Sequence, residues 1–205
     1  MRGGRAGRTS RGPAAPPPGE VRLIGGQWKR SKLPVPDRPG LRPTPDRVRE
    51  TLFNWLGQDL TGWRVLDAFA GSGALGFEAA SRGATEVQLI ECDAALARSL
   101  AESAKRLHAA AVQVTCADAL AWMGHCAAER FELVLLDPPF AAGLLGPAIA
   151  AAAPLVASGG WLYVESGIEK NAEGDDAPAA PPPGFEPWRT LHAGAVHAQL
   201  FRRAA

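Results

Sequence analysis

The stretch Asp67-Ala68-Phe69-Ala70-Gly71-Ser72-Gly73-Ala74-Leu75-Gly76 decides the fold of this 205-residue chain. It joins an apolar segment typical of a buried strand, Arg64–Ala68, to the helical pattern Ala74–Ser81. Its three glycines match the G-x-G-x-x-G spacing of a strand–turn–helix loop. Glycines let a ligand approach the backbone, and the helix start offers free N–H groups. The stretch therefore predicts a nucleotide-type ligand site in an α/β sheet.

Strand and helix patterns keep alternating downstream of this turn. We predict strands at Glu86–Ile90, Val112–Cys116, Phe131–Leu136 and Trp161–Glu165, and helices at Ala94–His108, Ala119–Cys126 and Leu144–Val156. Such alternation implies parallel strands with right-handed helical crossovers. Two further segments, Trp188–His192 and Val196–Phe201, are expected to form a closing antiparallel hairpin.

Three regions are distinguished by composition. Residues 1–19 are rich in Gly, Arg, Ala and Pro, so we expect a disordered basic tail. Residues 20–57 form a basic extension with a short strand, Val21–Gly26, a Pro-rich extended stretch and a helix. Residues 58–205 form the α/β domain, with a flexible insert at 167–184.

The helix of the extension has clear boundary signals. Thr44 is predicted as the N-cap and Pro45 as the first helical residue, and Gly57 is expected to end the helix.

Basic residues gather near the N-terminus, although the net charge is only +1. Residues 1–50 hold 12 Lys and Arg against 4 Asp and Glu, and the remainder holds 10 against 17. This asymmetry indicates a polyanionic partner, and phosphate backbones are the usual one. A solubilising tail would explain residues 1–12 alone, but later cations are interleaved with structured-looking sequence. The predicted contacts are Arg22, Lys29, Arg30, Arg42, Arg47 and Arg49.

Several classes of protein are disfavoured. No apolar run approaches the roughly 20 residues of a membrane span, and the N-terminus lacks the apolar segment of a secretory signal. The three cysteines, Cys92, Cys116 and Cys126, have no metal-ligand spacing. Their odd number favours buried thiols in a reducing compartment, so we expect a cytoplasmic protein that binds no metal.

The tetrad Asp137-Pro138-Pro139-Phe140 directly follows the predicted strand Phe131–Leu136. Two prolines end the strand and stiffen the loop, because neither has an N–H to donate. Ligands bind at this edge of open α/β sheets. The Asp137 carboxylate and the Pro138 carbonyl are suited to accept from the amino group of a planar base, and Phe140 to stack on its ring. A strand-ending turn with a core Phe is the plainer alternative, but the whole tetrad in this place favours function.

Acidic residues also follow the first three strands of the predicted sheet. Asp67 is placed to meet an ammonium group, Glu91 the hydroxyls of a ribose, and Asp118 an adenine amino group. Taken singly, the last two are equally well explained as solvated loop acids or helix caps. The glycines alone do not separate NAD from S-adenosylmethionine. The presence of Asp67, the single five-strand unit and the tetrad favour S-adenosylmethionine.

The predicted cofactor residues are Asp67, Phe69, Ala70, Gly71, Ser72, Gly73, Gly76, Glu91, Cys92, Asp118 and Ala119. The predicted catalytic residues are Asp137, Pro138, Pro139 and Phe140.

With these residues the chain resembles the bacterial 16S ribosomal RNA guanine-N2 methyltransferase family, whose target is guanine 966. The most specific matches are Arg22–Trp28 (RLIGGQW) and Leu41–Leu56 (LRPTPDRVRETLFNWL), and the resemblance runs from about Val21 to Glu165. It implies the class I S-adenosylmethionine-dependent methyltransferase fold, a mainly parallel, seven-stranded Rossmann-like sheet with helices on both faces and a reversed last strand. It also implies that the tetrad is the catalytic loop and that the basic extension touches RNA.

The function implied is methyl transfer from S-adenosylmethionine to the N2 amino group of a guanine in 16S rRNA. We expect a monomer that acts on an assembling or assembled 30S subunit, away from membranes. The nearest alternative is a DNA adenine-N6 or other nucleic-acid amino methyltransferase, because a similar loop serves that amino group. Such enzymes usually need a target-recognition domain, for which 205 residues leave little room. A nicotinamide dehydrogenase and a non-catalytic RNA-binding module are further alternatives.

Overall fold

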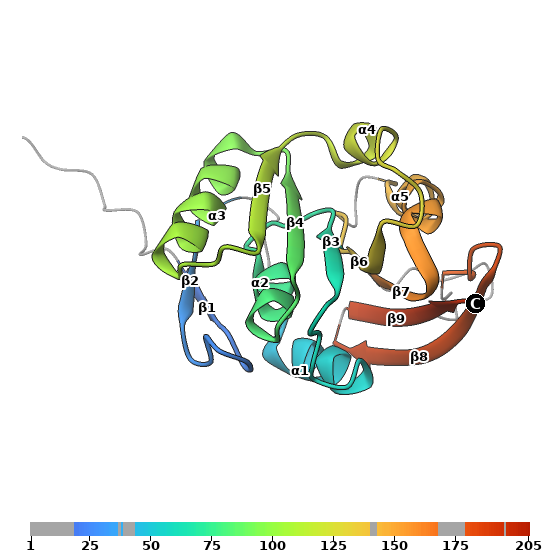
Figure 1. The fold of residues 1–205 in the computed structure, drawn as a ribbon, viewed down its shortest axis with the longest axis horizontal. Helices are drawn as coiled ribbons and strands as arrows, with labels where there is room; N and C mark the ends of the chain where they lie inside the picture. The colour runs from blue at the N-terminus through green and yellow to red at the C-terminus, as the bar shows by residue number, and fades with distance from the viewer. Residues whose placement is uncertain (1–18, 37, 39–43, 140–142, 168–178, 195) are drawn as a thin grey trace, which may run out of the picture.

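A seven-stranded sheet with the order β5-β4-β3-β6-β7-β9-β8 forms the centre of the protein (Figure 1). This computed structural model describes residues 19–36, 38, 44–139, 143–167, 179–194 and 196–205. The strands are β3 (Arg64–Asp67), β4 (Glu86–Glu91), β5 (Val112–Cys116), β6 (Phe131–Leu136), β7 (Val156–Gly167), β8 (Phe185–Ala193) and β9 (Val196–Arg203). The first five strands in this order, β5, β4, β3, β6 and β7, pair in parallel with their neighbours. Strand β9 pairs antiparallel with both β7 and β8. The closing hairpin predicted from the sequence is thus confirmed.

Helices cover both faces of this sheet. Residues of α1 (Asp46–Trp55), α2 (Ala74–Ser81) and α3 (Ala94–Arg106) share one apolar core with one face, and those of α4 (Ala119–Met123) and α5 (Leu145–Ala152) share a second core with the other. The two cores alternate along each strand, because successive side chains of a strand point to opposite faces. No helix within the described ranges has the length and apolar character needed to cross a membrane.

The helix before β7 is shorter than the sequence suggests. We predicted Leu144–Val156 with a stop at Gly159-Gly160, but α5 ends at Ala152, and a 3-10 turn, Ala153–Leu155, leads directly into β7. Pro154 explains the early end, because its nitrogen has no hydrogen for the helical ladder. The two glycines lie inside β7 instead, in the stretch where its register with β6 shifts.

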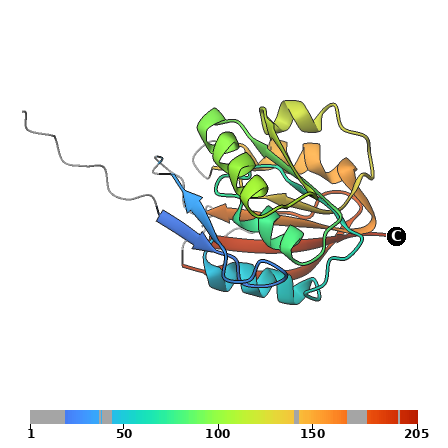
Figure 2. The ribbon, with the colours of Figure 1, turned by 60° about the vertical axis from the view of Figure 1, so that its left-hand side comes forward.

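The N-terminal extension contains a hairpin in place of the single strand that we predicted (Figure 2). Strands β1 (Gly19–Arg22) and β2 (Lys32–Val35) pair antiparallel. The bend between them lies against the end of α2, where the Gln27 N–H donates to the Ser81 carbonyl over 2.7 Å. Gly26 has φ +70°, and a Cβ there would lie 1.8 Å from the same carbonyl oxygen. The close approach of hairpin and helix therefore requires glycine.

Candidate active site

Four acidic residues lie at the carboxyl ends of four neighbouring strands. Asp67 ends β3, Glu91 ends β4, Asp118 follows β5 and Asp137 follows β6. These strands are parallel and adjacent in the sheet, so their ends meet at one edge. The fold thus gathers the predicted cofactor acids and the predicted catalytic acid on a single rim.

The glycine loop is fixed to the end of β4. The Ala70 N–H donates to the Ile90 carbonyl over 2.9 Å, and the Gly71 N–H donates to Glu91 Oε2 over 2.9 Å. Gly73, with φ +77°, precedes α2, and no side chain caps this helix. The loop is therefore held by backbone bonds and by the Glu91 carboxylate, and the residue before α2, Gly73, has no side chain to cap the helix.

The Asp67 carboxylate is hydrogen-bonded to the first turn of α2, at the last glycine of the loop motif. Its Oδ2 accepts from the Gly76 N–H over 2.9 Å, and a Cβ at Gly76 would lie 2.2 Å from a methyl of Leu89. Burial raises the pKa of Asp67 to about 7 despite the bond from Gly76, and the nearby carboxylates of Asp137 and Glu91 add to the rise. A contact between this side chain and an ammonium group stays a prediction.

Glu91 and Asp118 both bond to backbone groups. Glu91 Oε1 accepts from the Asp93 N–H over 2.8 Å, and Asp118 Oδ1 caps α4 by accepting from the Ala121 N–H over 2.8 Å. An ionised carboxylate has about four acceptor positions, so these bonds leave capacity for a ligand. Their roles toward a cofactor remain predictions.

The other predicted cofactor residues sit in the loop or beside the next strand ends. Ala70, Ser72 and Ala119 are buried, Phe69 is half-buried and Cys92 is exposed. The expectation of buried thiols is wrong, since Cys116 is exposed as well and Cys126 is only partly covered. Two of the three cysteines lie at the ends of strands or just beyond them, on the rim and not in the core.

Asp137 projects from the rim toward the N-terminal extension. Its Oδ2 accepts from the Thr44 hydroxyl over 3.5 Å, and burial raises its pKa to about 6. Pro138 is buried and Pro139 is exposed, while Phe140 lies outside the described residues. The turn therefore holds a partly buried carboxylate next to the glycine loop, as the tetrad suggested.

Thr44 has a different role from the one predicted. The residue that precedes α1 as its N-cap is Pro45, and no side chain caps this helix. The expectation of a Thr44 cap is therefore wrong. The Thr44 hydroxyl is buried and turned toward Asp137, which is a stronger acceptor than the backbone because it carries charge.

Glu165 is the residue of this site that sequence reasoning missed. It lies near the end of β7, is 1% exposed, and accepts from the Tyr163 hydroxyl at Oε1 over 2.8 Å. Burial and the neighbouring Asp137 carboxylate raise its pKa to about 8. An acidic residue that follows the apolar run Leu162–Val164 was the available signal, because the same pattern marks Asp137.

A small pocket opens between the loop after β6 and the end of β7. It is lined by Pro138, Pro139, Gly143, Leu144, Leu145, Glu165, Ser166 and Gly167. Its lining combines prolines, aliphatic side chains and the buried Glu165 next to Asp137.

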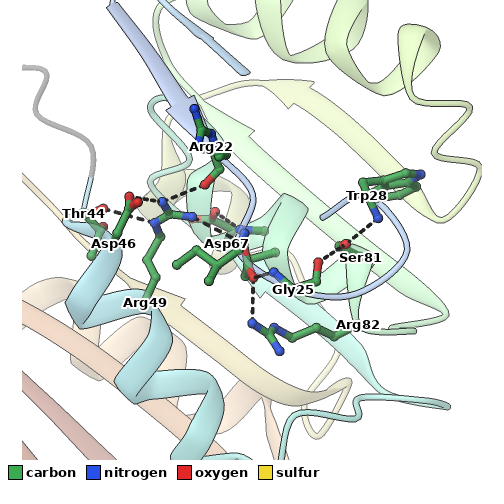
Figure 3. A network of polar contacts seen from close by, with 12 residues as sticks. Arg22, Gly25, Trp28, Thr44, Asp46, Arg49, Asp67, Ser81 and Arg82 are labelled. Carbon is green, nitrogen blue, oxygen red and sulfur yellow. Dashed lines mark hydrogen bonds and ion pairs between the residues drawn. The ribbon is translucent and has the colours of Figure 1, made fainter. Parts of the chain in front are cut away.

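Arg49 does not have the role that the sequence suggested (Figure 3). Its side chain has no exposure and donates to the carbonyls of Thr44 and Arg22 over 3.1 and 2.9 Å. It also forms ion pairs with Asp46 at 2.6 Å and Glu78 at 3.3 Å. A guanidinium with no exposed surface and these four partners cannot reach a phosphate. The prediction of an RNA contact for Arg49 is therefore wrong.

Glu78 of α2 is the centre of this network. Its Oε1 accepts from Arg82 Nη2 over 2.7 Å and from the Gly25 N–H over 2.8 Å, and its Oε2 accepts from the Ile24 N–H over 2.9 Å. One buried carboxylate thus joins α1, α2 and the N-terminal hairpin. Helical spacing could have placed Arg49 here, because it shares a face with Leu52 and Phe53.

The other cations predicted to contact RNA lie on the surface. Arg22, Lys29 and Arg30 of the hairpin region and Arg47 of α1 are exposed. Arg42 lies outside the described residues. Contacts of these side chains with RNA stay predictions.

The model of one protein family, Conserved hypothetical protein 95, matches residues 21–202. The chain belongs to this family. Ribosomal RNA small subunit methyltransferase D of Escherichia coli K12 is 42% identical over 91% of this chain and 92% of its own. The protein of the same name from Haemophilus influenzae is 38% identical over 90% of this chain and 94% of its own. The resemblance seen in the sequence is confirmed.

Solved structures agree on the architecture. A candidate methyltransferase from Escherichia coli, yhhF, superposes with a TM-score of 0.79 at 38% identity and covers 91% of this chain and 99% of its own. A candidate methylase from Haemophilus influenzae gives a TM-score of 0.75 at 33% identity, with 91% and 100% covered. The fold is that of class I methyltransferases, as the resemblance implied, and its one reversed strand is β9.

Proposed function

We propose that the protein transfers the methyl group of S-adenosylmethionine to the N2 amino group of a guanine in 16S ribosomal RNA, and that this guanine is position 966. The observation that supports this proposal most strongly is the position of Asp137-Pro138-Pro139. These three residues follow β6, next to the glycine loop after β3. The chain that contains them is 42% identical to ribosomal RNA small subunit methyltransferase D of Escherichia coli.

The rim suits the polar groups of S-adenosylmethionine. Glu91 and Asp118 have carboxylate oxygens for hydroxyl and amino groups. The cofactor, when bound in this place, supplies a methyl group attached to a positively charged sulfonium, which is an excellent leaving group. Acidic side chains around the rim favour a cationic ligand.

The chain positions the acceptor nitrogen. The N2 lone pair of guanine is delocalised into the ring, so the nitrogen is a poor nucleophile. The Asp137 carboxylate and the Pro138 carbonyl accept its N–H bonds and hold it in line for transfer, and most of the rate gain is positioning. The nitrogen acquires positive charge as it takes the methyl group, and the Asp137 carboxylate favours that charge. The N2 proton then passes to Asp137 or to water.

RNA would lie over the hairpin and the exposed side of α1. Arg22, Lys29, Arg30 and Arg47 are exposed there and are suited to contact phosphates. The target base must be unpaired or flipped out of its stack to reach the turn after β6. We place the reaction in the cytoplasm, on an assembling or assembled 30S subunit, with the enzyme as a monomer.

Methyl transfer to purified RNA tests the proposal. The enzyme is incubated with S-adenosylmethionine labelled in its methyl group and with 30S subunits from cells that lack the corresponding gene. Free 16S rRNA and duplex DNA are incubated in parallel. Mass mapping should find the label on N2 of guanine 966 and none in the DNA. Label on adenine in the DNA arm, or no label in either RNA arm, would overturn the proposal.

A further inference from the structure

Within the residues that the structure describes, Trp188 of β8 is the one large apolar side chain that is exposed, at 42%. The other tryptophans are all half-buried. Strand β8 is the last strand in the sheet order, and its register with β9 shifts between Pro187 and Arg189. Trp188 is the extra residue of this bulge, and bulges turn a side chain in a new direction. The fold therefore presents this indole ring to solvent at the edge of the sheet.

Two exposed arginines lie against this ring. The guanidinium of Arg189 is 5.0 Å from the centre of the Trp188 ring. That of Arg202, on β9, is 5.9 Å from the same ring and 5.4 Å from the ring of Trp161. The two indoles contact each other edge to face, with 5.6 Å between their centres. These four residues, Trp161, Trp188, Arg189 and Arg202, form one packed surface that we call the Trp188 patch.

The positive charge of the patch is not neutralised by a carboxylate. No ion pair in the described part of the chain includes Arg189 or Arg202. Glu186 lies opposite Arg202 in the register of β8 with β9, but the guanidinium lies over the indoles instead. The next cation along β9, Arg203, belongs to the other face and pairs with Glu129 over 2.9 Å. The two charges of the patch are therefore available to an anion.

Protection of the sheet edge does not explain the exposed indole. Outer strands are guarded against pairing with other chains by proline and by charged side chains, and Pro187 and Arg189 supply both. An exposed tryptophan adds apolar surface, which favours association and does not prevent it. Tryptophan and arginine are, however, side chains on which unpaired bases stack, and arginine also binds phosphates. The composition of the patch therefore fits single-stranded nucleic acid.

The patch adjoins the surface that we propose for RNA. Helix α1 packs against β8, and it also contacts the N-terminal hairpin, where Arg49 donates to the Arg22 carbonyl. Trp161 packs against the apolar core that contains residues of α1 and of the hairpin. These elements thus share one side of the sheet, and α1 lies between the hairpin and β8 in the view of Figure 1.

We propose that the Trp188 patch is a second RNA contact, in which an unpaired nucleotide of 16S rRNA stacks on Trp188 and neighbouring phosphates bind Arg189 and Arg202. This inference rests on the proposed function, which makes 16S rRNA the substrate. The occupant is identified by the two features of the patch, an accessible aromatic ring and uncompensated positive charge, which match a base and its phosphates.

The patch lies away from the reacting rim. Trp161 is paired with Leu133, early in β6, whereas Asp137 follows the end of that strand. A nucleotide on the patch is therefore a different nucleotide from the methylated guanine. The patch contributes to the affinity for RNA and leaves the chemical step unchanged.

Two substitutions at Trp188 test the stacking. Trp188→Leu keeps an apolar side chain without an aromatic face, and Trp188→Phe keeps such a face. Filter binding of 16S rRNA should find the affinity about tenfold lower in the Leu variant and within about threefold of the wild type in the Phe variant, because one stacked base contributes on this scale. The kcat, the affinity for S-adenosylmethionine and the melting temperature should stay those of the wild type. Equal RNA affinity in the wild type and the Leu variant, or equal losses in both variants, would overturn the proposal.

The salt dependence of RNA binding tests the two arginines. Combined Arg189→Ala and Arg202→Ala substitutions should reduce the slope of log K against log salt by about 1.5, because each phosphate contact contributes about 0.7–0.9. Arg203→Ala is the matched control, since Arg203 is the neighbouring cation on the other face and is paired with Glu129. It should leave the slope unchanged. A slope equal to that of the wild type in the double variant would overturn the proposal.

Parallel measurements distinguish RNA from other occupants of the patch. Weaker binding of the Leu variant to 30S subunits but not to free 16S rRNA would assign the patch to a ribosomal protein and overturn the RNA contact. Sedimentation of the wild type as a dimer and of the Leu variant as a monomer would assign it to a second copy of this chain, with the same consequence. Methylation of guanine 966 with unchanged RNA binding in the Leu variant would overturn the patch alone. Lost RNA binding in that variant, with wild-type label on another nucleotide, would overturn only the proposed target.

Discussion

Two groups of buried charge adjoin the start of α1, and they differ in how their signs are arranged. Around Glu78, cations and anions alternate, because the carboxylate lies between Arg49 and Arg82. Beside the turn after β6, Asp67, Asp137 and Glu165 are all acidic and meet hydroxyl and N–H groups. Buried charge is costly unless it is paired. The paired group around Glu78 is therefore suited to stabilise the fold. The acidic group around Asp137 has no such pairing, which fits the role in methyl transfer that we propose for Asp137.

The largest effect is expected at the acidic group. Asp137→Ala removes the acceptor of the N2–H bond, so kcat should fall by at least about a thousandfold, as expected when positioning and charge stabilisation are lost together. Calorimetry should find the affinity for S-adenosylmethionine within about twofold of the wild type, because Asp137 is not among the cofactor residues. Asp118→Ala is the matched control, which should lower the affinity for S-adenosylmethionine and leave kcat nearly unchanged. Lost cofactor binding in the Asp137 variant would contradict this division.

The paired group should respond through stability. Glu78→Gln leaves the guanidinium of Arg49 buried without its full counter-charge, and breaking a buried pair in this way costs about 3–5 kcal/mol. Urea unfolding monitored by circular dichroism measures the change. Glu132→Gln is the control, because its partner Arg64 is partly exposed and such pairs contribute at most about 1 kcal/mol. Similar losses in the two variants would remove the distinction between the buried network and a surface pair.

The acidic group should also make stability depend on pH. The pKa values of Asp67, Asp137 and Glu165 are raised in the folded protein, so the fold binds more protons than the unfolded chain between about pH 4 and pH 8. The contribution of these three groups to the free energy of unfolding must then fall as the pH rises through this range. Glu165→Gln should be more stable than the wild type at pH 8 by at least about 1 kcal/mol and equal to it near pH 4. Thermal melts at both values measure this, and a variant that is less stable at pH 8 would reject the raised pKa.

The smallest effect is expected from the exposed cations. Combined Ala substitutions of Lys29, Arg30 and Arg47 should weaken RNA binding and reduce the slope of log K against log salt by about two, because each phosphate contact contributes about 0.7–0.9. Filter binding of 16S rRNA at several salt concentrations measures the slope. Lys105→Ala on α3 is the control, since it is an exposed cation outside the hairpin and α1. A slope equal to that of the wild type would show that RNA binds to another surface of the protein.

Much of the rim could be predicted from the sequence, because the end of an apolar run marks the end of a strand. An apolar run followed by an acidic residue or by glycines identified Asp67, Glu91, Asp118 and Asp137. Parallel pairing then necessarily brings those ends together. Glu165 shows the same pattern after the apolar run Leu162–Val164, but it was read as the last residue of a strand and given no role.

Residues whose roles depend on tertiary contacts were the ones misjudged. Arg49 was assigned to the surface by its charge, although its helical spacing placed it among apolar residues. Thr44 fits the local pattern of a helix cap, but a carboxylate from β6 competes for its hydroxyl. Only the packed structure decides between a local partner and a distant one. The position of Phe140, which lies outside the described residues, is untested.

The backbone carbonyl of Thr44 accepts from Arg49, which pairs with Glu78, and Glu78 in turn binds the N–H groups of Ile24 and Gly25. The N-terminal hairpin and the segment at Thr44, which contacts Asp137, are thus held by the same two side chains, Arg49 and Glu78. Rebuilding the hairpin would therefore disturb these contacts and, through Thr44, the position of Asp137. The exposed cations of the hairpin, in contrast, can be exchanged while the buried salt bridges are left as they are.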